Sequence, residues 1–136
     1  MSLIHVDIDG VLVDGTIDES IAPFAKANGL GFNDGSILWS LHETHVADNP
    51  SKLNIPLLKH LSVLRDMGHH LKVWTDRPYT VRARTIDNLG SWAGIFDDFS
   101  FNSGKKIFTK DEGVIIDDNL KFEGCGEHFV HYPKFF

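Results

Sequence analysis

The stretch LIHVDIDGVLVDGT, residues 3–16, decides the fold that this sequence predicts. Residues 3–6 form a short, mostly apolar run, which is typical of a buried strand. The run ends at Asp7, and Gly10 and Gly15 then bracket a second apolar run, which indicates a turn or a small hairpin. The stretch therefore combines a strand, a carboxylate at the end of that strand and a tight turn.

Helices and strands alternate along the rest of the chain. We expect further strands at residues 71–74, within 95–101, at 113–116 and at 128–131, together with helices at about 20–28, 36–47, 56–67, 79–89 and 105–110. Continuous apolar strands that alternate with helices build a parallel sheet that is covered on both faces. The sequence thus predicts a three-layer, Rossmann-like α/β fold.

The length and composition fit one globular domain. A chain of 136 residues leaves little room for a second core, and 42% hydrophobic with 24% charged residues is typical of a folded protein. We therefore expect residues 1–136 to form a single domain. The segment between the first two strands, about residues 16–50, is a small insert with room for two short helices.

The charge balance and the cysteine count argue against several classes of protein. The net charge of −6 disfavours a broad basic surface for duplex nucleic acid. No apolar run approaches the roughly 20 residues of a membrane helix, and residues 1–10 lack the pattern of a secretion signal. Cys125 is the only cysteine, so we expect no internal disulfide and a location in the reducing cytoplasm.

Carboxylates follow two of the predicted strands. Asp7 and Asp9 lie two residues apart after the first strand, and Asp117 and Asp118 close the fourth. Because ligands of such sheets bind beyond the carboxyl ends of the strands, we expect these four side chains to share one edge. Four carboxylates would repel one another strongly without a hard divalent cation, and Mg²⁺ leaves room for water and phosphate ligands. The pattern predicts a magnesium site.

Residues that suit a phosphate group follow the second predicted strand and precede the fourth. Thr75 offers a hydroxyl, and its neighbour Asp76 a backbone N–H, to a phosphate oxygen. Lys105 or Lys106 would supply the positive charge that phosphoryl transfer requires. A carboxylate at this site would attack phosphorus to give an aspartyl-phosphate, which water then hydrolyses, and a second carboxylate would transfer the proton.

Other sites with similar residues fit the sequence less well. An EF-hand loop would need an oxygen ligand where this sequence has Val11, and a phosphate-binding P-loop would need a glycine where it has Phe99. A response-regulator receiver carries its acidic pair at the first strand, whereas the adjacent pair here comes last. His42 and His45 have no cysteine or third histidine at the spacing of a zinc site.

Three motifs in this order resemble those of the haloacid dehalogenase-like (HAD) superfamily of phosphohydrolases. VDIDGVLVDGT (residues 6–16) is similar to the first motif, WTDRP (74–78) to the second and GVIIDD (113–118) to the fourth. The resemblance spans residues 3 to about 120. It implies an Mg²⁺-dependent phosphatase in which the insert at about 16–50 forms a minimal helical cap over the site.

The resemblance also implies a role for each matching residue. Asp7 would be the nucleophile, Asp9 the general acid and base, and Thr75 the ligand of a phosphate oxygen. The third motif of the family is a lysine before the last motif, for which we favour Lys105 over Lys106. The metal site would use the aspartates of the first and fourth motifs, with one backbone carbonyl of the first: Asp7, Asp9, Asp117 and Asp118.

Within the superfamily, the short insert and the DGVLVD and TDRP sequences are similar to 5′-nucleotidases of the deoxyribonucleotidase type. This similarity implies nucleoside monophosphates as substrates, with Trp39 of the insert stacking on the base. Arg77 would reach an anionic part of the substrate or, alternatively, form a surface salt bridge. Other phosphate esters, including nucleic-acid 3′-phosphates, remain alternatives, as does a catalytically silent binding protein. A small cap is often completed by a partner subunit, so we also expect a homodimer.

Overall fold

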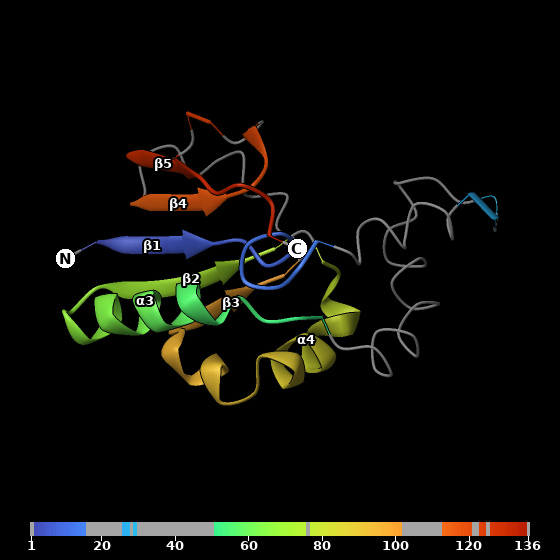
Figure 1. The fold of residues 1–136 in the computed structure, drawn as a ribbon, viewed down its shortest axis with the longest axis horizontal. Helices are drawn as coiled ribbons and strands as arrows, with labels where there is room; N and C mark the ends of the chain where they lie inside the picture. Colours follow the sequence, from blue (N-terminus) through green and yellow to red (C-terminus); the bar gives the residue numbers. More distant parts are fainter. Residues whose placement is uncertain are drawn as a thin grey trace.

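The computed structural model describes residues 2–15, 26–27, 29, 51–75, 77–101, 113–120, 123–124 and 126–135. Within these residues, five strands form one parallel sheet in the order β3-β2-β1-β4-β5 (Figure 1). The strands are β1 Leu3–Val6, β2 His70–Trp74, β3 Asp98–Ser100, β4 Val114–Asp117 and β5 His128–His131. This arrangement confirms the predicted α/β class and its parallel sheet.

Strand β1 lies at the centre of the sheet because it pairs on both sides. Ile4 is opposite Leu71 of β2 on one side and Val114 of β4 on the other. The last three residues of β1 are buried, as expected for a strand whose two faces are both covered. Its end therefore places Asp7 in the middle of one edge of the sheet.

Gly113 allows β4 to approach β1 closely. Its φ of +54° lies in the left-handed region that favours glycine. A Cβ at this position would also collide with the carbonyl oxygen of Leu3, the first residue of β1. The glycine of the GVIIDD motif is thus required by the packing of the strands.

Helix α3, Ile55–Asp66, begins and ends close to the predicted residues. The Asn54 side chain caps its first turn by accepting a hydrogen bond from Leu57 N at 3.4 Å, and a proline occupies that turn. Leu58 and Leu61 are fully buried in the core beneath the sheet.

None of the helices in the described part of the chain is long and apolar enough to cross a membrane.

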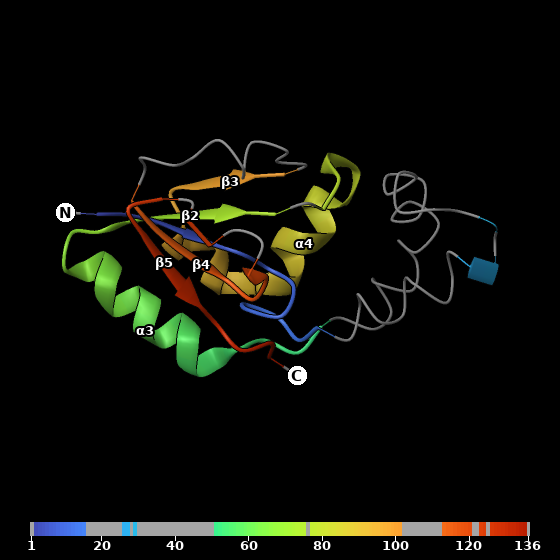
Figure 2. The ribbon, with the colours of Figure 1, turned by 90° about the horizontal axis from the view of Figure 1, so that it is seen from above.

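The helix predicted at 79–89 consists of two parts. A 3₁₀ turn, η2 Tyr79–Val81, leads into α4 Arg82–Leu89, which ends at Gly90 with φ +59°. A second 3₁₀ segment, η3 Gly90–Ile95, contacts both α4 and α3, so these helices cover the same face of the sheet (Figure 2). The third strand, Asp98–Ser100, lies within the predicted stretch 95–101, and η3 overlaps that stretch only at Ile95.

The apolar core has a part on each face of the sheet. One part joins leucines of α3 and α4 to buried residues of β1 and β2. On the other face, Trp74 and Ile115 are buried, and Phe129 packs against them. Burial on both faces agrees with the three-layer architecture. The helices predicted at 20–28, 36–47 and 105–110 lie wholly or largely outside the described residues.

We expect Gly113→Ala to destabilise the fold more than Gly124→Ala. Both glycines have positive φ values, +54° and +88°, so alanine is strained at each by about 1–2 kcal/mol. Only at Gly113 would the Cβ also meet backbone atoms, whereas Gly124 has no atom within 4 Å of that position. The urea midpoints of the two variants measure the difference. Equal midpoints would mean that β4 can move away from β1 at no cost.

Candidate active site

Three neighbouring strands end at residues that suit phosphoryl transfer. Thr75 follows β2, Asp7 follows β1 and Asp117 is the last residue of β4, and the three strands lie side by side (Figure 1). Asp7 N donates a hydrogen bond to Ile116 O at 3.0 Å, and Thr75 N donates to Ser100 O at 2.9 Å. Both residues are therefore held by the hydrogen bonding of the sheet.

Asp7, Asp117 and Asp118 form an acidic cluster at this edge. Each offers one carboxylate oxygen, and the three oxygens lie within 4.8 Å of one another. Asp7 and Asp117 are buried and Asp118 is half-buried. Asn119 N donates to Asp117 Oδ1 at 2.9 Å and so orients that carboxylate. Converging carboxylate oxygens are the donors that Mg²⁺ prefers, so the acidic cluster fits a divalent cation.

The electrostatics of the acidic cluster favour a bound cation. Burial raises the pKa of the Asp118 carboxyl, and the negative charge of Asp117 also raises it, while a hydrogen bond with Asp7 lowers it. The raised pKa means that a further negative charge at this position costs free energy. A divalent cation between the carboxylates would remove that cost.

The fourth predicted carboxylate, Asp9, contacts a different partner. Arg77 Nε donates to Asp9 Oδ2 at 3.0 Å, and Arg77 Nη2 donates to Asp9 Oδ1 at 2.5 Å. Arg77 Nη1 donates to Thr85 Oγ1 at 3.0 Å. The side chain of Arg77 is 3% exposed and that of Asp9 13%, so the arginine is buried, Asp9 is half-buried and the ion pair is not one of the protein surface. Contact of Arg77 with a substrate stays a prediction.

Thr75 is buried at the end of β2, and the backbone of Arg77 orients its hydroxyl. Arg77 N donates to Thr75 Oγ1 at 3.1 Å. This position is compatible with the predicted contact to a phosphate oxygen. Asp76, the predicted backbone donor, lies outside the described residues.

The loop after β1 is compact and passes beside the acidic cluster. Ile8 O accepts hydrogen bonds from the N–H groups of residues 11–13 at 3.0–3.1 Å, and Gly10 N donates to Val13 O at 2.9 Å. Gly10 has a φ of +80°, and a Cβ there would lie 2.6 Å from Asp118 Oδ2. Glycine at this position is therefore required both by the turn and by the approach of Asp118.

The residues that follow β5 lie against the same loop, a contact that the sequence did not predict. Phe135 N donates to Gly10 O, and Gly15 N donates to Phe135 O, both at 2.8 Å. Tyr132 Oη accepts a hydrogen bond from Asn54 Nδ2 at 2.9 Å. The only signal in the sequence is the aromatic character of this segment, which indicates burial but identifies no partner.

The two ends of the insert are joined next to the loop. Asp14 N donates to Lys52 O at 2.9 Å, and Lys52 N donates to Asp14 Oδ2 at 2.7 Å. The insert at 16–50 therefore leaves and re-enters the described structure at adjacent positions, which is compatible with a cap beside the site. Besides Asp76, three predicted site residues lie outside the described residues: Trp39, Lys105 and Lys106.

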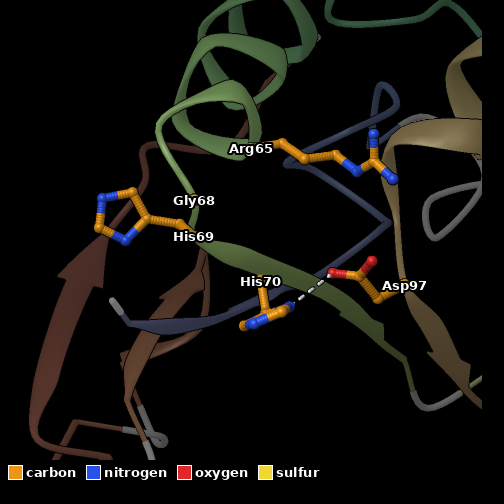
Figure 3. Close-up of a pocket in the computed structure, with 5 residues that line it drawn as sticks. All are labelled: Arg65, Gly68, His69, His70 and Asp97. Carbon is orange, nitrogen blue, oxygen red and sulfur yellow. Dashed lines mark ion pairs between the residues drawn. The ribbon is translucent and has the colours of Figure 1, made fainter.

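A shallow pocket of about 180 Å³ lies at the end of the sheet where the strands begin, opposite the acidic cluster (Figure 3). His70 Nδ1 is 3.4 Å from Asp97 Oδ2, and both side chains are well exposed. An exposed pair of this kind contributes little to stability. The pocket is formed where β2 begins and so is separate from the acidic cluster. Its lining residues are Arg65, Gly68, His69, His70 and Asp97.

Solved structures match the fold of this chain, although no protein-family model and no curated protein sequence matches it. A protein described as a β-phosphoglucomutase from Thermotoga maritima matches with a TM-score of 0.60 and 16% identity, over 96% of this chain and 94% of its own. A haloacid dehalogenase-like family hydrolase from Streptococcus pneumoniae matches with 0.59 and 14%, over 98% and 95%. A predicted phosphoglycolate phosphatase from Haemophilus somnus matches with 0.55 and 13%, over 85% and 76%. At these identities the likeness is one of fold, and it confirms the Rossmann-like α/β architecture.

We expect Mg²⁺ to raise the melting temperature, because a ligand that binds only the folded state shifts unfolding by mass action. The rise should be larger at about pH 7 than at about pH 5. The pKa of Asp118 is raised, so its protonated carboxyl stabilises the metal-free fold, and this contribution is lost as the pH rises through that pKa. At the higher pH the ionised carboxylate can bind the cation instead of a proton. Differential scanning fluorimetry with Mg²⁺ or a chelator measures both effects.

The matched variants are Asp118→Asn in the acidic cluster and Asp66→Asn, an exposed carboxylate at the end of α3. We expect the Mg²⁺-induced rise to shrink in the first variant and to stay unchanged in the second. An equal rise in Asp118→Asn and in the original protein would contradict a metal site at the acidic cluster.

Proposed function

We propose that this chain is an Mg²⁺-dependent phosphomonoesterase of the HAD-like superfamily that acts through a phosphorylated Asp7. The observation that carries the proposal is the separation of two carboxylates after β1. Asp7 lies in the acidic cluster, whereas Asp9, two residues later, pairs with Arg77. A nucleophile beside a cation site and a second carboxyl outside it is the arrangement that nucleophilic and acid–base catalysis require. The three sequence motifs and the likeness in fold support the same family.

The first step transfers the phosphoryl group to the enzyme. Asp7, Asp117 and Asp118 would hold Mg²⁺, which supplies positive charge to the phosphate oxygens when bound. Thr75 and Lys105 bind the same oxygens and orient the group. A carboxylate oxygen of Asp7 then attacks phosphorus, the bond from phosphorus to the ester oxygen breaks, and that oxygen takes the proton of Asp9. The products are an alcohol and phosphorylated Asp7.

The second step regenerates the enzyme. Asp9, which is now ionised, removes a proton from a water molecule as the water attacks phosphorus. The bond between phosphorus and the Asp7 oxygen breaks and inorganic phosphate leaves. Asp7 is again a carboxylate and Asp9 is again protonated, so one water molecule is consumed for each ester hydrolysed.

We further propose nucleoside monophosphates as the substrates. Trp39 lies in the insert. Hydrogen bonds between Asp14 and Lys52 join the two ends of this insert beside the loop after β1. An indole ring on a cap at this place would stack on a base while the phosphate occupies the site, and stacking of this kind contributes about 1–3 kcal/mol.

We expect Asp7→Asn to abolish turnover of every phosphate ester, because an amide cannot form the covalent intermediate. Asp9→Ala should have a different effect, because a proton is needed only when the leaving group is a poor one. It should slow phosphoenzyme formation from phenyl phosphate by about 10²–10⁴-fold and from p-nitrophenyl phosphate far less. Rapid-quench measurement of the burst separates this step from hydrolysis.

Asp97→Asn is the control for both variants, because Asp97 lies at the end of the sheet opposite the acidic cluster. Full turnover by Asp7→Asn, or by the original protein in excess chelator, would overturn the proposed mechanism. Absence of activity on any phosphate ester would instead indicate a HAD-like binding protein.

We expect Trp39→Ala to lower kcat/KM for a nucleoside monophosphate relative to p-nitrophenyl phosphate by about 5- to 150-fold, which corresponds to the loss of one stacking contact. Trp39→Phe keeps an aromatic ring and should retain most of the preference. An unchanged ratio in Trp39→Ala would remove the argument for a nucleotide substrate and leave the phosphatase mechanism intact.

A further inference from the structure

We infer that Arg77 is a positioning residue that holds the Asp9 carboxyl in the orientation needed for proton transfer to the leaving group. The inference rests on the proposed function, in which Asp9 is the general acid and base. Arg77 lies outside the acidic cluster and donates hydrogen bonds to both carboxylate oxygens of Asp9.

The geometry of the pair favours orientation of the carboxylate over substrate binding. Arg77 contacts Asp9 through two different nitrogens, Nε and Nη2, and a planar fork of this kind fixes the plane of the carboxylate as well as its place. The arginine side chain is the more deeply buried of the two, 3% exposed against 13% for Asp9. The guanidinium therefore lies behind the carboxylate, and the carboxylate forms the more exposed part of the pair.

The arginine is itself anchored on its far side. Arg77 Nη1 donates to Thr85 Oγ1 at 3.0 Å, and Thr85 is 2% exposed on α4. Helix α4 therefore fixes the place of Arg77 through Thr85, and Arg77 in turn fixes the place of Asp9. A buried guanidinium requires partners of this kind, because an unpaired buried charge is strongly unfavourable.

The pair also keeps Asp9 away from the cation. The acidic cluster contains Asp7, Asp117 and Asp118, and Asp9 is only two residues from Asp7. A side chain without a fixed partner at this place could turn toward a divalent cation, and its oxygens would then be occupied as ligands. Each Asp9 oxygen that accepts one hydrogen bond from Arg77 still has lone-pair capacity for a proton.

The backbone and the side chain of Arg77 contact different residues, which makes the role of the side chain testable. The backbone N–H donates to Thr75 Oγ1, while the guanidinium contacts Asp9 and Thr85. A substitution at position 77 therefore removes the contact with Asp9 and keeps the hydrogen bond that orients Thr75. Thr85→Val removes only the anchor.

The experiment measures phosphoenzyme formation by rapid quench with two aryl phosphates that differ in leaving group. In Arg77→Ala we expect a loss of about 10²-fold with phenyl phosphate and of less than about tenfold with p-nitrophenyl phosphate, because only the first requires the proton of Asp9. Thr85→Val should show the same pattern with a smaller loss. Arg82→Ala, an exposed arginine on the same helix, should change neither rate.

A double-mutant cycle decides whether Arg77 acts through Asp9. If it does, Arg77→Ala should add no further leaving-group-dependent loss to Asp9→Ala, because the residue that it positions is already absent. Arg77→Lys restores a positive charge without the planar fork and should keep the selective loss with phenyl phosphate. The Mg²⁺-induced rise in melting temperature shows that each variant is folded with an intact metal site.

Several outcomes would overturn the inference. Equal losses with both aryl phosphates, or additive losses in the double variant, would mean that Arg77 supports the fold or the phosphate site. Full activity in Arg77→Lys would mean that charge and not orientation is required. A wild-type protein that forms no phosphoenzyme would overturn the proposed function and this inference together, whereas the other outcomes leave the proposed function standing.

Discussion

Mutual repulsion among three carboxylates is the constraint on which the rest of the site depends. Their oxygens lie within 4.8 Å of one another at the carboxyl ends of β1 and β4, where two of the three side chains are buried. Carboxylates in a low-dielectric environment are favourable as charged groups only with a compensating cation. Burial raises the pKa of the Asp118 carboxyl most, the charge of Asp117 raises it further and a hydrogen bond with Asp7 lowers it, so burial and repulsion together disfavour the charged form of Asp118.

The two aspartates of the first motif lie in different surroundings. Asp7 continues the hydrogen bonding of the sheet through Ile116 O and so stays in the acidic cluster. Asp9 lies within the turn that begins at Ile8, and its carboxylate pairs with Arg77. Of two carboxylates separated by one residue, one therefore pairs with an arginine of the chain and the other lies in a cluster that fits a divalent cation. Because of this separation, the pair can serve two chemical roles.

Backbone hydrogen bonds connect the loop after β1, residues 8–15, to itself and to the segment after β5. Ile8 O accepts three hydrogen bonds from the residues of the loop, and Gly10 allows it to pass Asp118. The segment after β5 adds a second layer, since Phe135 bonds to Gly10 on one side and Gly15 to Phe135 on the other. The loop therefore lies between the carboxyl ends of the strands and a segment from the far end of the described chain.

The sequence by itself determined where the strands lie along the chain and which polar residues follow them, because apolar runs and the polar residues after them are local features. The strand at 128–131 was predicted at its observed bounds, and Asp7, Thr75 and Asp117 were assigned to strand ends where the structure has them. The tertiary structure alone decided which side chains meet. Asp9 was grouped with the other carboxylates but pairs with Arg77, 68 residues away, because a buried guanidinium at that place offers it two donors. The contact of Phe135 with Gly10 likewise joins distant residues. Such contacts depend on how β2, α4 and β5 pack around β1, and no local pattern of residues records that packing.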